Sequence, residues 1–474
     1  MTAPWSNGLR GFTTLVLLVV AGCAIDQAKE VAKYRSVVGP DQPLPAFTPG
    51  EPLSLQRALE LANQNNEQIG LQGEAYLQAL IAKDRAVGNF LPTLSMNPAY
   101  SFRQQSLPNT GSPFSSTNAA FTNSVSGNQN LFRGFRDINT YRAANLTTDQ
   151  RRALLLNTQA NVLVLVAQTY YQAILSERNV EVLRNSLVVQ EAHVDEARKR
   201  VEARVAIPLD VFQSEAQAAN TRGLLITAQN NVVNGRSTLT FLLGVPVQSS
   251  PLIDDVRIPA ELPTLDQLLE QGSQYRQDLI AAAAAIAAAK YEVHVAIGQY
   301  YPSVTLNLNY ILSKPEVSNS SWWSGVLSAN IPIFSAGQIH ADVRSAWSNL
   351  RSAKLSESQT RKQVVEDVEI SYHNIFASRE RVQVLEVQVV AAAEALRQAE
   401  ERFKAGAGPN IDRLVAQDQL LSAQLQLTTA QVNYKLFHLE LLRAIGKLTT
   451  RLPGQPTTQP TTLPTAPTTA PAAQ

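Results

Sequence analysis

Two stretches of the sequence decide the fold: LPTLSMNPAYSF at residues 91–102 and YPSVTLNLNYIL at residues 301–312. In each, the proline at the second position ends a helical segment, because proline disfavours helical geometry in the residue before it. Apolar side chains then alternate with small polar ones, the period of two expected for a β-strand with unlike faces. A polar loop and a return strand follow, at about Asn118–Phe132 and Trp322–Phe334. We therefore expect two related β-hairpins.

The expected strands have the length and polarity of membrane strands. About 9–11 residues suffice for a β-strand to cross the hydrocarbon core. Aromatic residues suited to a membrane interface lie near the strand ends, at Tyr100, Tyr310, Trp322 and Trp323. Two soluble, half-buried hairpins would show the same periodicity, so that alternative stays open. The strand at Asn118–Phe132 alternates poorly and is the weakest of the four.

The hairpins belong to an internal duplication of the chain. Pro92 and Pro302 are 210 residues apart, whereas Asp210 and Asp412 are 202 apart. The separation therefore changes by eight residues after Pro92, and the first copy carries the longer insertion. Each copy is expected to open with a helical run, at about Leu55–Phe90 and Leu265–Tyr300.

Two very long helices are expected after the hairpins, at about Arg136–Arg204 and Gln338–Lys404. At ~1.5 Å per residue, each would be roughly 100 Å long. Apolar residues recur in a heptad pattern along both, interrupted in the first by Gln190, and such a seam is typical of a coiled coil. Short turns containing Gly and Pro then reverse the chain into shorter helices, at Leu209–Gly244 and Ile411–Gly446.

The first residues are typical of an export signal. The apolar run Phe12–Ala21 is too short to span a ~30 Å hydrocarbon core, so it indicates a signal peptide. Val20-Ala21-Gly22-Cys23 resembles the bacterial lipobox, in which the cysteine becomes the acylated first residue, and Ala24 after it favours delivery to the outer membrane. A chance cysteine is the alternative. The expected divisions are a signal peptide (1–22), a lipidated tether (23–52), two repeats (53–250 with a hairpin at about 93–132, and 262–447 with a hairpin at about 303–334) and a disordered Thr/Pro-rich tail (452–474).

Composition excludes several classes of protein. The 40 Lys and Arg against 39 Asp and Glu give a net charge of +1, which argues against a nucleic-acid partner. One Cys rules out an intrachain disulfide and any cysteine-cluster metal site. The five His form no HExxH motif, and no nucleophile–base pair stands at short spacing. We therefore expect no enzyme activity, no catalytic residue, no cofactor and no metal site.

Four amphipathic strands cannot close a membrane barrel, because open sheet edges are not tolerated in hydrocarbon and known bacterial barrels of one chain begin at about eight strands. The chain must therefore oligomerise. This combination resembles the TolC-type outer-membrane efflux protein family, in particular the lipoprotein branch that serves RND-type tripartite efflux. The marks of the resemblance are the duplicated opening at Leu53–Leu59, the prolines 92 and 302, the strand ends Leu131–Gly134 and Ile333–Gly337, and Asp210 and Asp412 just past the tip turns.

The resemblance implies an α+β membrane protein with an internal duplication. A homotrimer would pool four strands per chain into a 12-stranded barrel, continued by a long periplasmic α-helical coiled-coil barrel. It would be a lipid-anchored, passive exit duct in the outer membrane that expels small molecules, with a periplasmic adaptor (membrane fusion) protein and an inner-membrane pump of RND or ABC type as partners. The alternatives are the channel of a type I protein secretion system and a structural periplasmic coiled-coil lipoprotein.

The resemblance also assigns roles at the helix tips. Asp210 and Asp412 match the tip carboxylates of the family, which implies a constricted, cation-favouring entrance. An Asp at a helix start is also a plain cap, and that interpretation stays open. Phe403 stands where some members have a Tyr that takes part in gating. This chain therefore has no hydroxyl at that position for a gating contact. Val415 replaces a second carboxylate, for which Asp418 is the nearest substitute. The tip-turn residues expected to dock the adaptor are Ala206, Pro208, Gly406 and Gly408.

Overall fold

The computed structural model describes residues 25–39, 45, 47–105, 116–259, 261–313 and 321–450. The expected signal peptide, Cys23 and the Thr/Pro-rich tail lie outside these residues. The chain folds as two compact units. Unit 1 comprises the N-terminal segment to Pro43 with Glu67–Gln159 and Ser273–Glu366, and unit 2 comprises Leu44–Asn66, Ala160–Gly272 and the segment from Asp367 onward.

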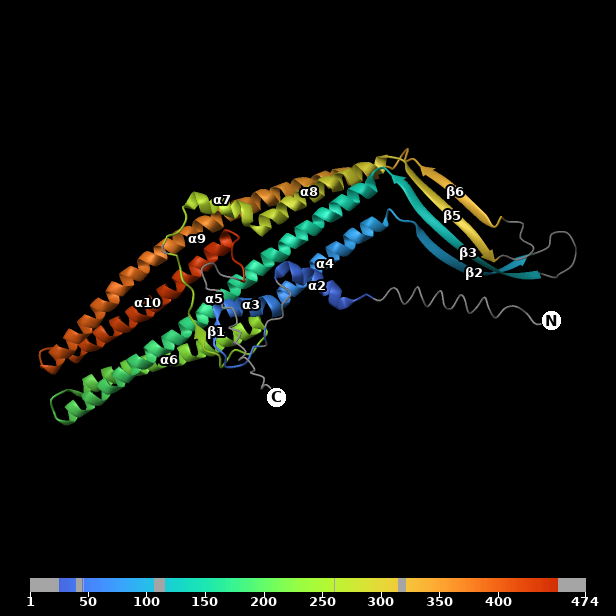
Figure 1. Ribbon diagram of the computed structural model, residues 1–474. Helices are drawn as coiled ribbons and strands as arrows, with labels where there is room; N and C mark the ends of the chain where they lie inside the picture. The colour runs from blue at the N-terminus through green and yellow to red at the C-terminus, as the bar shows by residue number, and fades with distance from the viewer. Residues whose placement is uncertain are drawn as a thin grey trace, which may run out of the picture. The chain divides into compact units, whose positions relative to one another are not determined.

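Unit 1 contains a four-stranded antiparallel sheet in the order β2-β3-β5-β6 (Figure 1). Its strands are β2 (Thr93–Gln105), β3 (Ser116–Arg133), β5 (Ser303–Ser313) and β6 (Trp323–Asn330). Both expected hairpins are therefore present, and pairing of β3 with β5 joins the two copies of the duplication into one sheet. Strands β2 and β6 are the two edges.

The strand register gives the sheet two unlike faces. One row of paired residues runs Ser95–Ser126–Asn309–Ser324 across all four strands, and the neighbouring row runs Leu94–Gly127–Leu308–Gly325. Side chains of successive residues point to opposite faces, so these rows lie on opposite sides of the sheet. On the polar face, the hydroxyl oxygens of Ser95 and Ser126 are 2.7 Å apart. On the apolar face, a Cβ added to Gly127 would lie 3.2 Å from Cδ2 of Leu94, so glycine makes room for leucine there.

Two strands differ from the expectation. β3 alternates poorly because its register shifts twice against β5, between Asn123 and Ser124 and between Asn130 and Phe132. A bulge places two residues opposite one and thereby inverts the alternation beyond it. The expected return strand to Phe334 is wrong at its end, since β6 stops at Asn330, and Phe334 is 88% exposed beside the left-handed turn at Ala336 and Gly337.

The helical run expected at the start of each copy is present and is divided into separate helices. The first copy has α3 (Leu55–Asn65) and α4 (Glu67–Gly88), and the second has α7 (Leu265–Tyr275), α8 (Gln277–Ile297) and the short 3₁₀ helix η1 (Gly298–Tyr300). The break falls at Asn66 and at Arg276, whose backbones are extended. The side-chain amide of Asn66 donates to Leu242 O at 3.3 Å, and the Arg276 guanidinium pairs with Asp278 at 2.6 Å. Each side chain therefore fixes its residue outside helical geometry.

The expected tether at 23–52 contains a helix that the sequence reasoning missed. Helix α2 (Gln27–Val38) begins after Asp26, whose carboxylate accepts from the backbone N–H of Ala28 at 3.1 Å. Its buried Tyr34 lies on Gly73 of α4, where an added Cβ would come within 2.3 Å of the ring. The tight fit explains why α2 packs on unit 1 instead of remaining a free linker.

Among the helices in the described residues, only the segment Gln277–Tyr300 is long and apolar enough to cross a bilayer. Its apolar character comes largely from alanine. Val293 and Ala296 of this segment pack against Ala346 and Leu350 of α9 (Gln338–Lys404). These contacts identify the segment as a packed helix of unit 1.

Unit 2 is built on two helical hairpins (Figure 1). The first joins the part of α5 (Arg136–Glu202) from Ala160 onward to α6 (Pro208–Leu243). The second joins the part of α9 from Asp367 onward to α10 (Asn410–Ala444). The expected bounds of the two long helices agree with these within two residues. On the coiled-coil seam of α5, the apolar residues Leu183, Leu187, Val194 and Ala197 are buried. Gln190 is buried as well, so it belongs to the seam that it was expected to interrupt.

One end of unit 2 is organised around a small parallel sheet of β1 (Leu53–Ser54) and β4 (Leu252–Ile253). The hydroxyl oxygen of buried Tyr170 lies 2.6 Å from Leu53 O and 2.7 Å from Ile253 O, and it accepts from the Ile253 N–H at 2.9 Å. Beside it, Asp254 accepts from Arg178 at 2.5 Å and from Lys435. We call Tyr170, Tyr171, Arg178, Asp254 and Lys435 the sheet-end cluster.

Candidate functional site at the helix tips

The opposite ends of the hairpins in unit 2 meet around a buried arginine. Arg413, in the first turn of α10, is only 1% exposed. Its Nη1 donates to Oε2 of Glu196 on α5 at 2.6 Å, and its Nη2 donates to Oδ1 of Asn410 at 2.8 Å. A buried charge is tolerated when it is paired and hydrogen-bonded, as it is here. Arg413 thus ties the second hairpin to the first.

The ring of Phe403, at the end of α9, lies between two guanidinium groups. Cζ of Arg200 is 4.3 Å from the ring centroid, and Cζ of Arg413 is 4.2 Å from it. Both distances are within the range of a cation–π interaction, and both cations are held by the ring's electron-rich faces. Phe403 and Arg413 are buried, whereas the side chain of Arg200 is 27% exposed, so the contact with Arg413 is the one shielded from water.

Asn410 extends this arrangement to the fourth helix. Its Nδ2 donates to the backbone oxygen of Asp210 at 3.3 Å and to Oγ of Ser214 at 3.2 Å, both on α6. Asn410 and Ser214 are fully buried. The group that joins α5, α6, α9 and α10 is called the tip cluster here, and its members are His193, Glu196, Arg200, Ser214, Phe403, Asn410 and Arg413.

His193 is the titratable member of the tip cluster. Burial, and next the positive charge of Arg413, lower the pKa of its imidazole to about 4, so the ring is neutral at pH 7. Its nitrogens lie 4.0 Å from Glu196 and 3.9 Å from Glu400, which are therefore close carboxylates and not ion pairs at neutral pH. Burial raises the pKa of Glu196, but the hydrogen bond and charge of Arg413 outweigh it and lower the pKa below its ordinary value.

The predicted carboxylates occupy the first turns of the two short helices without capping them. The N-cap residues are Ile207 and Pro409, and neither helix has a side-chain capping hydrogen bond. Asp210 and Asp412 therefore do not cap their helices by a hydrogen bond, and that part of the plain-cap interpretation is wrong. A carboxylate in the first turn still interacts favourably with the helix dipole. Only the backbone of Asp210 takes part in the tip cluster. Asp418, the predicted substitute for a second carboxylate, accepts from Nε2 of Gln217 at 3.0 Å.

The tip turns carry exposed apolar side chains. Val205, Ile207, Leu209 and Phe212 of the first turn and the start of α6 are all more than half exposed. The predicted docking residues Ala206 and Pro208 lie in this turn, while Gly406 and Gly408 lie in the second turn. Gly406 has a φ of +71°, a left-handed conformation that favours glycine. Docking at these residues remains a prediction.

The sequence reasoning found Phe403 but missed its partners. Arg413 and Gln417 stand three and seven residues after Asn410, at helical spacing on the buried side of α10. Polar residues at core positions of a coiled coil were the available signal. The sequence alone does not show that Arg413 is buried, because its partner Glu196 lies 217 residues away.

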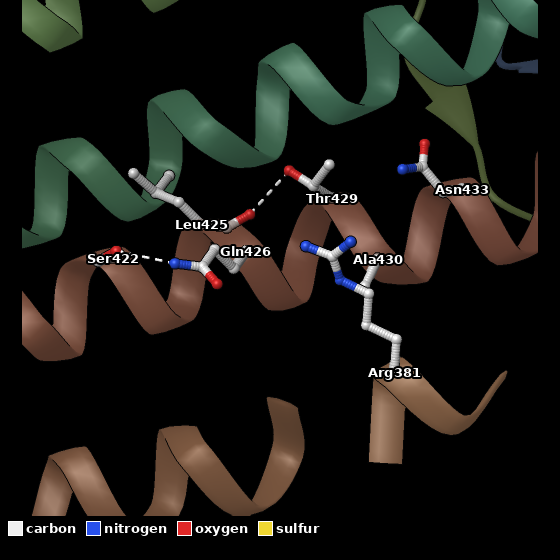
Figure 2. A pocket seen from close by; sticks show the side chains of 7 residues that line it. All are labelled: Arg381, Ser422, Leu425, Gln426, Thr429, Ala430 and Asn433. Carbon is white, nitrogen blue, oxygen red and sulfur yellow. Dashed lines mark hydrogen bonds between the residues drawn. The ribbon is translucent and has the colours of Figure 1, made fainter. Parts of the chain in front are cut away.

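Figure 2 shows a second feature of unit 2, an open hollow of about 320 Å³ between α9 and α10. Arg381 of α9 reaches toward it, while Gln426 donates to Ser422 and Thr429 donates to Leu425 O along α10 (Figure 2). The described residues that line it include no carboxylate, thiol or imidazole. Elsewhere in the described part of the chain, no three His, Cys, Asp or Glu side chains converge to hold a metal ion.

Comparison with known proteins agrees with this architecture. A family model described as "Outer membrane efflux protein" matches residues 58–245 and 268–447. The chain is 24% identical over 302 residues to outer membrane protein TolC of Vibrio cholerae serotype O1, covering 62% of this chain and 69% of that protein. It is 25% identical over 328 residues to outer membrane efflux protein BepC of Brucella suis biovar 1, covering 68% of this chain and 71% of that protein.

The fold is shared with a solved structure as well. The crystal structure of outer membrane protein VceC from Vibrio cholerae matches with a TM-score of 0.73 and 22% identity, over 83% of this chain and 96% of that chain. The family model covers both copies of the duplication, so the predicted family, the outer-membrane location and the efflux function are confirmed. The chain belongs to the outer membrane efflux protein family.

Proposed function

We propose that this chain is the outer-membrane exit duct of a tripartite efflux system, a passive homotrimer that expels small molecules. The observation that supports this proposal most directly is the four-stranded sheet with two open edges, β2 and β6. Unpaired strand edges are not tolerated in hydrocarbon, so copies of the chain must pair edge to edge. Three copies give twelve strands, which is within the range of bacterial barrels.

The two faces of the sheet suit such a barrel. The row Met96–Val125–Tyr310–Trp323 would face lipid, with its aromatic residues at the membrane interface. The polar face carries the row Ser95–Ser126–Asn309–Ser324 across all four strands, and Nδ2 of Asn97 donates to Oγ of Ser126 at 2.9 Å. A hydrogen-bonding lining suits a water-filled exit. A coiled-coil spacer has no use for a sheet of this kind.

The long helices also require partner copies. Val384, Val387 and Val390 of α9 are about 70% exposed and recur at helical spacing, as do Ile226, Val233 and Phe241 of α6. Exposed apolar rows of this kind mark interfaces between proteins. We assign them to neighbouring copies in a helical barrel. Cys23 is proposed to carry the lipid anchor.

Energy for transport is proposed to come from partners. TtgC of Pseudomonas putida, a relative with 27% identity, is named a probable efflux pump outer membrane protein. By that analogy, an inner-membrane pump of RND or ABC type and a periplasmic adaptor protein would complete the system. The exposed apolar turn around Ala206 and Pro208, with Gly406 and Gly408 in the second turn, is the proposed docking surface. Asp210 and Asp412 are proposed to favour cations at the entrance.

Planar-bilayer conductance of the purified mature protein, with the oligomer mass of the same sample, tests this function. We expect a trimer that gives small, discrete, cation-favouring steps, and a weaker cation preference in the double variant Asp210→Asn and Asp412→Asn. A monomer without conductance in any variant would contradict the proposal.

Two neighbouring residues of β5 provide a matched pair for the barrel. Leu308→Arg places a charge on the proposed lipid face, at a cost of about 2–4 kcal/mol near the membrane midplane, and should prevent stable insertion. Asn309→Arg places the same charge on the opposite face and should leave insertion intact while reducing the cation preference. Equal loss of insertion in both variants would show that the two faces do not divide lipid from lumen.

A further inference from the structure

We propose that Asn97, Asn330 and Gly88 are the residues by which one copy of this chain recognises the next. In this proposal, β6 of one copy pairs with β2 of its neighbour so that Asn330 stands opposite Asn97, and Gly88 makes room for the neighbour at the junction of sheet and helices. The inference deepens the proposed function and rests on it. That function requires the free strand edges to meet, but it does not say which residues pair.

The duplication relates each edge strand to an inner strand. Strand β3 recurs 202 residues later as β6, and β5 recurs 210 residues after β2, the two separations of the duplication. Inside the chain, Asn128 of β3 is paired with Asn307 of β5. The equivalent residues are Asn330 of β6 and Asn97 of β2, so all four members of the two pairs are asparagine. A pairing made inside the chain can therefore be repeated between copies.

The early end of β6 fits this pairing. Strand β3 runs to Arg133, whose equivalent is Ser335, whereas β6 stops at Asn330. The last part of β3 is paired with β5 alone, because its pairing with β2 ends at Asn128. Residues 331–335 are the equivalents of this last part, so the partner that would extend β6 is β2 of another copy. We therefore expect β6 to lengthen to Ser335 on assembly.

Exposure of the edge strand agrees with this interpretation. All eight residues of β6 are exposed, and Ile333 and Phe334 beyond it are 96% and 88% exposed. Phe132, the equivalent of Phe334, is half-buried inside the chain. Pro332 is compatible with a strand here, because its equivalent Asn130 stands beside a bulge, and proline within sheets is found at bulges. Large apolar side chains exposed side by side mark an interface.

Gly88 is the helix residue expected to meet the neighbour. Its equivalent Gly298 lies so close to Gly134 that a Cβ added to Gly134 would be 2.3 Å from Gly298 O. Among the described residues, a Cβ added to Gly88 would meet no atom within 4 Å outside its own helix and its chain neighbours, and its φ is not positive. Neither packing nor backbone geometry within one chain therefore requires glycine at 88. The equivalent of Gly134 is Ala336, so we expect Gly88 to face Ala336 of the next copy.

The junction between copies should be looser than the junction inside the chain. The methyl group of Ala336 occupies the side of the crossing where the chain's own junction has glycine, so the two backbones cannot approach as closely. The ion pair between Arg133 and Asp137 is also not repeated, because the equivalent residues are Ser335 and Ile339. Recognition between copies should therefore depend on strand pairing and on the space that the remaining glycine leaves.

Disulfide formation between copies tests the register. Full-length trimers that carry Asn97→Cys with Asn330→Cys, or Met96→Cys with Ile331→Cys, are oxidised and then separated by mass under denaturing conditions. The second combination is equivalent to the next residue pair of β3 and β5. Adjacent pairs of an antiparallel sheet alternate between a wider and a closer spacing, and the closer one, with Cα atoms ~4.5 Å apart, suits a disulfide. We expect covalent trimers in at least one of the two variants.

A covalent product of this kind can join only two copies. Strands β3 and β5 separate β2 from β6 within one chain. At ~4.8 Å per strand the two edges are about 14 Å apart, against the ~4.4–6.8 Å between the Cα atoms of a disulfide. Met96→Cys with Asn330→Cys is the matched control, because these side chains point to opposite faces of the sheet and should not be linked.

The role of Gly88 is tested without cysteines. Gly88→Leu should fold with an unchanged helical circular dichroism spectrum, but should associate at least about tenfold more weakly because its side chain fills the space expected for Ala336. Gly298→Leu is the counterpart inside the chain and should impair folding itself, since a Cβ there would lie 2.6 Å from Gly134 O. Analytical ultracentrifugation in detergent measures the association.

The outcomes separate the contact between copies from the duct. A conducting trimer that gives no covalent product with either cysteine pair, or in which the control pair is linked equally, would overturn the register and leave the duct standing. Undiminished association of Gly88→Leu would overturn the junction with Ala336. A native chain that is monomeric and does not conduct would overturn the proposed function and, with it, the contact between copies.

Discussion

The two ends of unit 2 differ in how their buried polar side chains are held. At the sheet end, Tyr170 and Asp254 lie among three-way polar contacts, and large apolar side chains such as Leu239 and Leu243 are completely buried around them. At the tip end, the same helices bury Gln190, Thr221 and Gln417, each with an unpartnered oxygen. Buried atoms without partners also occur near the sheet end, at Asn179 and His438, so the two ends differ in the number of contacts that hold their key polar groups.

Charged groups follow the same division. Asp254 accepts from both Arg178 and Lys435, so loss of one partner leaves the other in place. At the tip, the buried Arg413 depends on one carboxylate, that of Glu196. Loss of Glu196 would leave Arg413 without a carboxylate partner, whereas Asp254 keeps one cation when the other is lost. We therefore expect loss of one ion pair to disturb the tip end more than the sheet end.

The largest expected effect is truncation of the core at the sheet end. Leu243→Ala should destabilise unit 2 by about 2–5 kcal/mol, because Leu243 is completely buried and the cavity left behind cannot collapse fully. The midpoint of thermal unfolding, followed by helical circular dichroism of the trimer, measures it. Leu187→Ala at the tip is the matched change and should shift the midpoint less, because Leu187 is 9% exposed and packs in a small cluster with Val194 and Ala218. Equal shifts of the unfolding midpoint in the two variants would contradict the proposed difference between the two ends.

The next effect is a loss of tip stability in acid. The pKa of His193 is lowered to about 4 in the folded tip, against about 6.5 when the tip is open. The open state therefore binds the proton more readily, and stability that is complete above about pH 6.5 is lost as the pH falls toward 4, by about 3 kcal/mol in total. Groups facing His193 are Glu196 on α5, Glu400 and Lys404 on α9, and Arg413 on α10.

Hydrogen exchange of the tip amides, corrected for the intrinsic pH dependence of exchange, measures this loss. Amides around Tyr170 in the same sample should keep their protection over the same pH range. His193→Gln should remove most of the pH dependence at the tip. Persistence of the full dependence in that variant would assign it to the carboxylates instead.

The smallest effect distinguishes two adjacent tyrosines of the sheet end. Tyr170→Phe removes a hydroxyl that contacts Leu53 O, Ile253 O and Ile253 N, and should cost about 1–3 kcal/mol. Tyr171→Phe removes a hydroxyl whose contact is a 3.3 Å hydrogen bond to Asp254, which keeps its two cations, and should cost less. The exchange rate of the Ile253 amide measures the difference. Faster exchange in Tyr171→Phe than in Tyr170→Phe would contradict the assigned role of Tyr170.

Much of the fold was predictable because its strands and helices follow from patterns among residues that are close in the sequence. The alternation after Pro92 and Pro302 predicts the strands, and the prolines mark where the preceding helices end. The long heptad seams predict α5 and α9 to within two residues, since helix period and length are local properties. The duplicated order of these patterns was sufficient to indicate the family, and the family supplied the location and the efflux function.

The tertiary structure decided what depends on a partner far away in the sequence. Asn66 breaks its helix because its side chain reaches Leu242, and the segment before Pro49 holds a helix because Tyr34 fits on Gly73. The tip cluster is the same kind of feature: Arg413 and Glu196 are 217 residues apart, and only the packing of the two hairpins makes them an ion pair. A sequence shows which residues could carry charge or pack, whereas burial and pairing are created when distant segments meet.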